Sequence, residues 1–120
     1  MSLNHTYLDQ FIRVTEFAAY GASPYIGKGD KNAADKGAVD RMRSELNRID
    51  MIGKVVIGEG EMDKAPMLFI GENVGTKKGS KIDIALDPLE GTNFTANNLP
   101  GAFSVIAVAE KGNLLSAPDT

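Results

Sequence analysis

Two stretches of the chain space their apolar residues as an amphipathic helix does. In the first, which we expect to begin near Thr6, apolar or small side chains recur every three or four positions, namely at Leu8, Phe11, Ile12, Thr15, Ala18, Ala19 and Ala22. Pro24 must kink or stop this helix, because proline lacks the N–H that a helix needs. In the second stretch the apolar stripe consists of Val39, Met42, Leu46 and Ile49. We expect Asn32 to cap this helix and Asp50 to lie near its end.

Three shorter apolar runs, rich in β-branched residues, predict strands at residues 54–57, 81–86 and 103–109. Pro88 should stop the second strand, since proline has no N–H to give to a sheet ladder. The segments 75–81 and 93–101 are polar and are expected to be loops, whereas the apolar run 67–70 is too short to assign. Helices and strands together place the chain in the α/β class.

Acidic side chains follow two of the predicted strands. Glu59 and Glu61 alternate with glycines after the first strand, and Asp87 and Glu90 follow the second. Ligands of open α/β sheets lie beyond the carboxyl ends of the strands, so neighbouring strands would bring these acids together. Buried carboxylates are costly unless they are paired or bind a cation, and their oxygens suit Mg²⁺ or Mn²⁺. The alternative for both segments is an ordinary turn with its acids in water.

A further acid, Asp35, lies in the first turn of the second predicted helix. It follows a loop at residues 27–32 that is rich in glycine and basic residues. An acid at this place complements the helix dipole, which would explain Asp35 without any ligand. The alternative is that Asp35 faces the same metal site, with the loop lying over it. The carboxylates of Asp35 and Glu59 would then lie within roughly ten ångströms, since metal–oxygen bonds are about 2.0–2.6 Å long.

Composition narrows the chemistry that the chain can support. The 120 residues suffice for one domain with a core, and the net charge of −3 argues against nucleic acid or an anionic membrane as the main partner. There is no cysteine and only one histidine, His5, which excludes thiol chemistry and leaves a Ser-His-Asp triad little to build on. No apolar run suits a membrane span or a signal peptide, so we expect a cytoplasmic protein. Chemistry must rest on carboxylates, hydroxyls, lysines and arginines.

Residues 87–92, Asp-Pro-Leu-Glu-Gly-Thr, resemble the D-P-[IL]-[DE]-G-[TS] signature of the metal-dependent, lithium-sensitive-type sugar phosphatases, which include inositol monophosphatases and fructose bisphosphatases. The segments 27–35, 56–61, 65–68 and 70–72 resemble, more specifically, class II fructose-1,6-bisphosphatase of the bacterial GlpX type. The resemblance implies a layered αβαβα sandwich. Residues 1–120 would form its N-terminal, metal-binding portion, with two helices packed on a mixed sheet.

The resemblance also implies a metal-ligand set. Asp35 and Glu59 would hold one Mg²⁺ or Mn²⁺ ion, and Asp87 and Glu90 would hold a second. A paired-metal site suits phosphoryl hydrolysis, because it stabilises both the attacking and the leaving oxygen.

Catalytic and substrate-binding roles follow from the same resemblance. Thr92 matches the family's catalytic threonine, which activates the attacking water, and Glu59 is the second catalytic candidate. Glu90, Gly91 and Thr92 would contact the 1-phosphate of the substrate. Supporting roles are expected for Asp30, Lys31 and Glu61.

The implied reaction is the hydrolysis of fructose 1,6-bisphosphate to fructose 6-phosphate in gluconeogenesis, extending to sedoheptulose 1,7-bisphosphate, in a homo-oligomer. The family's chains are far longer than 120 residues, so a non-catalytic metal- or phosphate-binding fragment is one alternative. A phosphatase for inositol phosphate or another small phosphate ester is the other. Glu90 stands where inositol phosphatases commonly have aspartate, and this favours the fructose bisphosphatase.

Overall fold

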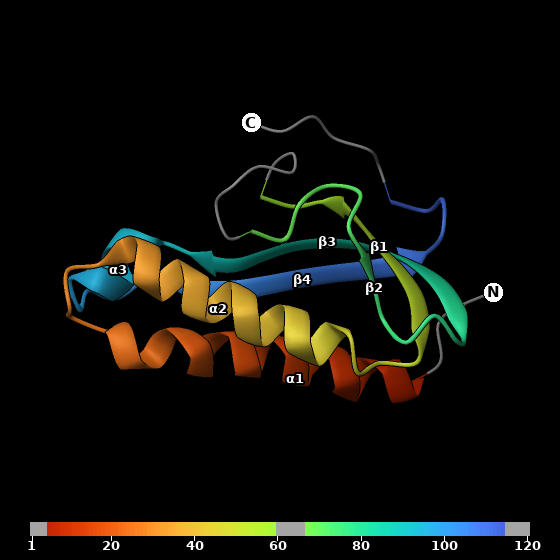
Figure 1. Cartoon of the computed structure of the whole chain (residues 1–120), viewed down its shortest axis with the longest axis horizontal. Coiled ribbons are helices and arrows are strands. Elements are labelled where there is room, and N and C mark those ends of the chain that lie inside the picture. The colour runs from red at the N-terminus through yellow and green to blue at the C-terminus, as the bar shows by residue number, and fades with distance from the viewer. Residues whose placement is uncertain (1–4, 60–66, 115–120) are drawn as a thin grey trace.

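The computed structural model describes residues 5–59 and 67–114, which form one layer of helices packed on one mixed sheet (Figure 1). The elements, in chain order, are α1 (His5–Ala22), the 3₁₀ turn η1 (Ser23–Tyr25), α2 (Lys31–Leu46), β1 (Met51–Ile57), β2 (Asn73–Val74), β3 (Ser80–Glu90), α3 (Thr92–Ala96) and β4 (Phe103–Glu110). The predicted α/β portion with two helices on a mixed sheet is confirmed. The expectation for Glu61 falls outside the described residues.

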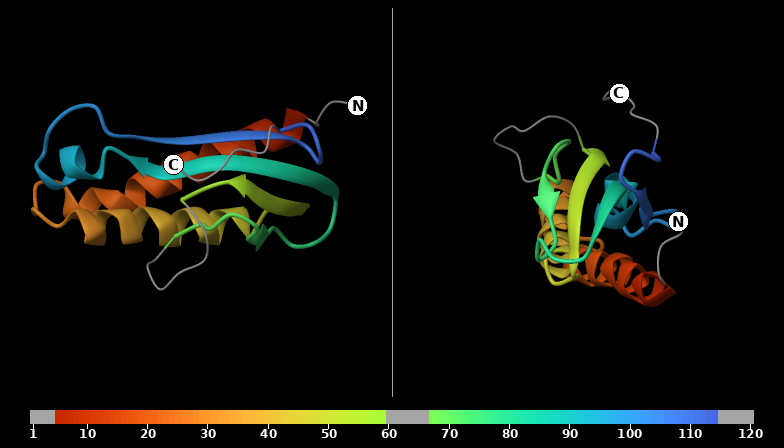
Figure 2. Two further views of the ribbon diagram at one scale, coloured as in Figure 1. Left: turned by 90° about the horizontal axis from the view of Figure 1, so that it is seen from above. Right: turned by 90° about the vertical axis from the view of Figure 1, so that its right-hand side faces the viewer.

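The sheet has the strand order β2-β1-β3-β4. β1 and β3 are parallel neighbours, whereas β2 and β4 run antiparallel to the strands that they join. Both long helices cover the same face of this sheet (Figure 2). Because β1 and β3 run in the same direction, the residues that follow them emerge at the same edge.

The core lies between the helices and the sheet, and its fully buried members include Val14, Ala18, Ala38, Met42, Leu46, Val55, Leu68 and Ile84. The backbones of the two helices are in close contact at Gly21 and Gly37. A Cβ atom placed on Gly37 would lie 2.1 Å from the carbonyl oxygen of Gly21, so only glycine fits there. None of the helices in the described ranges combines the length and apolar character needed to cross a bilayer.

Both helices differ from their predicted limits. Helix α1 begins by His5, so Thr6 lies inside it, and it ends before Pro24 as expected. The cap of α2 is Asp30, whose carboxylate accepts a hydrogen bond from the N–H of Ala33 at 3.0 Å, and the prediction of Asn32 as the cap was wrong. The same helix ends at Leu46 rather than near Asp50, since the backbone then tightens into turns.

The central strand is longer than predicted and continues past Pro88 to Glu90. The expectation that proline stops the strand was wrong, because the pairing of β3 with β4 shifts between Asp87 and Glu90 and an irregularity accommodates the proline. Within it, the N–H of Leu89 donates to the Asp87 carboxylate at 3.1 Å. The expected loop at 93–101 was also partly wrong, since its first residues belong to the short helix α3.

Candidate metal centre

Glu59 and Asp87 lie at the same level, just past the last paired residues of the parallel strands β1 and β3. Ile57 of β1 is in register with Ala85 of β3. Glu59 lies two residues after Ile57, and Asp87 lies two residues after Ala85. The two acids therefore emerge side by side from the sheet, as the alternation of apolar runs and acids had indicated.

The backbone of Leu68 holds Glu59. The N–H of Leu68 donates to the Glu59 carboxylate at 3.0 Å, and the N–H of Glu59 donates to the carbonyl of Leu68 at 3.1 Å. Leu68 itself is fully buried. Burial raises the pKa of Glu59 to about 7, with the charges of Asp35 and Asp87 adding to the rise and the Leu68 hydrogen bond opposing it.

Asp35 reaches the same place from helix α2. A hydrogen bond joins the Asp35 and Glu59 side chains. Burial and then the charge of Asp87 raise the pKa of Asp35, while the bond to Glu59 opposes this rise. Two carboxyl groups can share a hydrogen bond only if one carries a proton, and this bond raises the pKa of Glu59 while it lowers that of Asp35, as expected if Glu59 is the donor. Asp35 lies past the first turn of α2, which contains no acid, so complementing the helix dipole does not explain it.

Glu90 pairs with Asp87 at the end of β3. A hydrogen bond to Asp87 is the main cause of the raised pKa of Glu90, and the Asp87 charge adds to it. Glu90 is exposed, whereas Asp87 is half-buried. The four acids thus form two hydrogen-bonded pairs, and the charge of Asp87 also acts on Asp35 and Glu59.

Gly91 and Thr92 follow the acids directly. Gly91 takes a left-handed conformation with φ of 85°, and a Cβ atom there would lie 2.9 Å from the ring of Phe94. The sharp turn that results places Thr92 at the start of α3, half-buried. The loop before α2 lies against this helix, because the N–H of Gly29 donates to the carbonyl of Ala96 at 2.8 Å.

The chemistry of these side chains fits a divalent cation. All four offer carboxylate oxygens, the ligands that Mg²⁺ and Mn²⁺ prefer. Burial first, and then the neighbouring charges, disfavour the ionised forms of Asp35 and Glu59, and a bound cation would offset both effects. Within residues 5–59 and 67–114, no three such side chains already surround a common point as a metal ion would require. The ligand set from the sequence stays a prediction.

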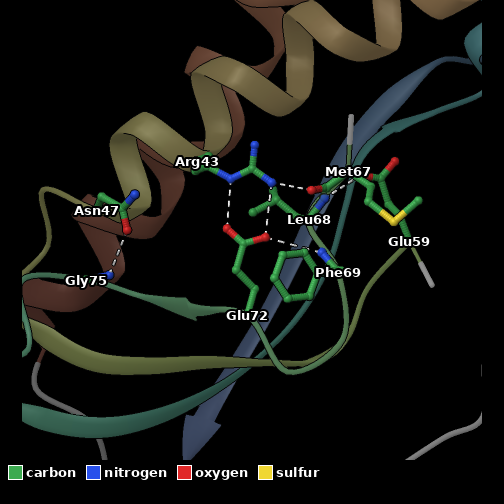
Figure 3. Close-up of polar contacts among 8 residues, drawn as sticks. All are labelled: Arg43, Asn47, Glu59, Met67, Leu68, Phe69, Glu72 and Gly75. Carbon is green, nitrogen blue, oxygen red and sulfur yellow. Dashed lines mark hydrogen bonds and ion pairs between the residues drawn. The ribbon is translucent and has the colours of Figure 1, made fainter. Parts of the chain in front are cut away.

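The role of Arg43 in holding this arrangement was missed by sequence reasoning, whereas supporting roles were expected for Asp30 and Lys31. Arg43 of α2 forms an ion pair with Glu72 and donates to the carbonyl of Met67, next to Leu68 (Figure 3). Asp30 caps α2, and the adjacent Lys31 is its first residue. A lone arginine on a helix looks in sequence like a surface charge, and only the fold reveals its partner.

A parallel pair of strands with acids at their carboxyl-terminal ends and a further acid from a helix is an arrangement that suits a divalent cation. Comparison with known families makes this specific. Residues 5–120 match the model described as bacterial fructose-1,6-bisphosphatase, glpX-encoded, and the chain belongs to this family.

Individual relatives agree with the family match. The chain is 54% identical over 110 residues to fructose-1,6-bisphosphatase 1 class 2 of Escherichia coli strain K12, covering 92% of this chain and 33% of the relative. It is 50% identical over 122 residues to the D-fructose 1,6-bisphosphatase class 2/sedoheptulose 1,7-bisphosphatase of Thermosynechococcus vestitus, covering 92% and 35% of the two chains. The chain therefore spans about a third of the length of these relatives.

Proposed function

We propose that this chain supplies the metal-holding part of a phosphatase that hydrolyses the 1-phosphate of fructose 1,6-bisphosphate to give fructose 6-phosphate. The observation that carries the proposal is that two hydrogen-bonded carboxyl pairs, Asp35 with Glu59 and Asp87 with Glu90, lie close enough for the charge of Asp87 to act on the first pair. Membership of the glpX-encoded fructose-1,6-bisphosphatase family supports the substrate. The name of the Thermosynechococcus relative supports sedoheptulose 1,7-bisphosphate as a second substrate.

Asp35 and Glu59 would hold one divalent cation, Mn²⁺ or Mg²⁺, and Asp87 and Glu90 a second. Bound there, the cations would stabilise charge on the phosphoryl oxygens and lower the pKa of an attacking water. Asp35 and Glu59 would then exchange their shared proton for a metal ion. The Leu68 N–H binds one oxygen of Glu59 and would leave the other to a cation.

Thr92 would orient the attacking water through its hydroxyl. The turn at Gly91 carries Thr92 from the end of β3 to the start of α3, two residues beyond Glu90. Glu90, Gly91 and Thr92 would contact the 1-phosphate, and Glu59 would act with Thr92 at the reacting centre. An assembly of identical chains and a cytoplasmic location stay predictions.

Calorimetric titration with Mn²⁺ tests the metal site on the 120-residue chain. We expect binding to the wild type, a strong loss in Asp35→Asn, and no change in the control Asp40→Asn. Asp40 lies on the same helix but is exposed and paired with Lys36 at 2.6 Å. No binding at millimolar Mn²⁺, or equal binding by both variants, would reject the site.

Phosphate release tests the reaction. A chimera would join residues 1–120 to the remaining part of the Escherichia coli relative, with fructose 1,6-bisphosphate and inositol phosphate as substrates. We expect Mn²⁺-dependent release from the sugar bisphosphate, a loss of about 10²–10⁴-fold in Thr92→Ala, and partial activity in Thr92→Ser. If Thr92→Ala keeps its turnover and only melts earlier, the threonine is structural. If inositol phosphate is the better substrate, the alternative phosphatase is correct.

A further inference from the structure

Arg43 joins helix α2 to the segment 67–72 by three hydrogen bonds (Figure 3). Its Nε donates to Glu72 Oε2 at 2.7 Å, and its Nη2 donates to Glu72 Oε1 at 3.0 Å and to the carbonyl oxygen of Met67. The two side chains are only 32% and 11% exposed. Two parallel N–H···O bonds fix both the distance and the plane of the carboxylate, as a single charge contact does not.

The segment is held from its other side by strand β1. The N–H of Val55 donates to the carbonyl of Glu72 at 2.9 Å, and the N–H of Gly71 donates to the carbonyl of Val55 at 2.7 Å. The Glu72 carboxylate also accepts the N–H of Phe69 at 3.4 Å. The Arg43–Glu72 pair therefore fixes both Met67 and Phe69, the two neighbours of Leu68.

Leu68 is the residue that holds Glu59. It makes both backbone contacts, one to the carboxylate of Glu59 and one to its N–H. A short path of contacts thus leads from the Arg43 guanidinium through Met67 and Leu68 to the Glu59 carboxylate. The charge of Glu59 also contributes to the raised pKa of Arg43, of which the hydrogen bond to Glu72 is the main cause.

Arg43 also shares a face of α2 with an acid of the site. Asp35, Val39 and Arg43 follow one another at intervals of four residues, which places them on one side of the helix. One helix face thereby presents Asp35 and, two turns later, fixes the segment that aims Glu59 at Asp35.

We propose that Arg43 is a positioning residue for the metal centre: through Met67 and Glu72 it fixes the Leu68 backbone that orients the Glu59 carboxylate toward Asp35. This inference rests on the proposed function, because it concerns the same metal site. A group that orients a metal ligand typically changes metal affinity by about 10–100-fold. If the Arg43–Glu72 ion pair served only the fold, its removal would lower the stability of the chain and leave the metal affinity of the folded protein unchanged.

Calorimetric titration with Mn²⁺ on the 120-residue chain tests the proposal. The variants are Arg43→Met, Arg43→Lys and Glu72→Gln, each also melted without metal. We expect the Kd for Mn²⁺ to rise about 10–100-fold in Arg43→Met. Arg43→Lys keeps the charge but loses the fork, so its Kd should lie between those of the wild type and Arg43→Met.

Arg48→Met is the matched control. Arg48 also pairs with a glutamate, Glu45, at 3.3 Å, but its side chain is 76% exposed. Its loss should leave the Kd unchanged. Glu59→Gln is the reference for direct loss of a ligand, and it should weaken binding at least as much as Arg43→Met.

The outcomes separate the two proposals. If the wild type binds Mn²⁺ and Glu59→Gln weakens binding, but Arg43→Lys and Glu72→Gln both keep the wild-type Kd, the positioning role is overturned and the metal site stands. If the wild type binds no Mn²⁺, the metal site is overturned and this inference with it. Should Arg43→Met fail to fold, the two milder variants decide the result.

Discussion

Replacing Glu59 by glutamine should stabilise the metal-free chain at about pH 8 and leave its stability near pH 4 unchanged. The pKa of Glu59 is raised from 4.5 to about 7, first by burial and then by the charges of Asp35 and Asp87. Between these two pH values the folded chain binds more protons than the unfolded chain, so stability falls as the pH rises through this window. Glutamine stays neutral, and its amide oxygen still accepts the Leu68 N–H.

The size of the effect follows from the pKa of Glu59. A rise from 4.5 to about 7, at about 1.4 kcal/mol for each tenfold change in proton affinity, sets a ceiling of roughly 3 kcal/mol. Glu59 is only partly buried, and solvent screening reduces this to about 1–2 kcal/mol. For a chain of this size, that corresponds to a rise in Tm of roughly 3–10 °C.

Thermal unfolding followed by circular dichroism, in a chelating buffer from about pH 4 to pH 8, measures this difference. Glu16→Gln is the control, because it removes an exposed carboxylate of the same size from α1. Mn²⁺ at about 100 times its Kd should then reverse the order at pH 8, since it stabilises the wild type by about 2.7 kcal/mol. If Glu59→Gln melts at or below the wild type at pH 8 in chelator, or if the difference does not change with pH, the burial of repelling charge at Glu59 is refuted.

Gly37→Ala should lower the Tm, since its Cβ would lie 2.1 Å from the Gly21 carbonyl oxygen and overpacking costs about 1–3 kcal/mol. Alanine in a helix without this contact would stabilise by about 1 kcal/mol, so the sign of the Tm change decides. Asp30→Ala should cost about 0.5–2 kcal/mol in a urea titration, whereas Asn32→Ala should cost little, because Asp30 is the cap of α2. Equal losses in the two variants would contradict the assignment of the cap.

The helices and strands of this fold can be predicted from the sequence more reliably than the residues at which they begin and end. The apolar periodicity locates both long helices and the three main strands, because these patterns reflect burial on one face. It misses the continuation of β3 through Pro88, since the backbone there is shaped by its pairing with β4, a contact distant in the chain. For the same reason the short helix after Gly91 is hidden in a polar segment.

For the candidate site too, the sequence predicts some features and misses others. Glu59, Asp87 and Glu90 are visible in the sequence because they follow apolar runs that predict strands, and the parallel order of β1 and β3 brings Glu59 and Asp87 together. The hydrogen bonds that support Glu59 are not visible in the sequence, because they join residues that are distant in the chain. Leu68 lies 9 positions from Glu59. Arg43 lies 29 positions from Glu72 and 24 from Met67. A residue that acts by holding backbone leaves no local pattern.

The arrangement makes metal affinity a property of the fold and not of the acids alone. Asp35, Glu59 and Asp87 come from a helix, from the residues after β1 and from the central strand, and each is fixed by elements that also form the core. The fold therefore buries these acids and sets their charges against one another whether or not a cation is present, and both effects raise the pKa values of Asp35 and Glu59. A cation that removes this repulsion binds more tightly by the free energy that the repulsion had cost, provided that the carboxylate oxygens already point toward it. Loosening the Leu68 backbone should thus weaken metal binding even though no ligand is removed, which links the Arg43 variants to the Glu59 titration.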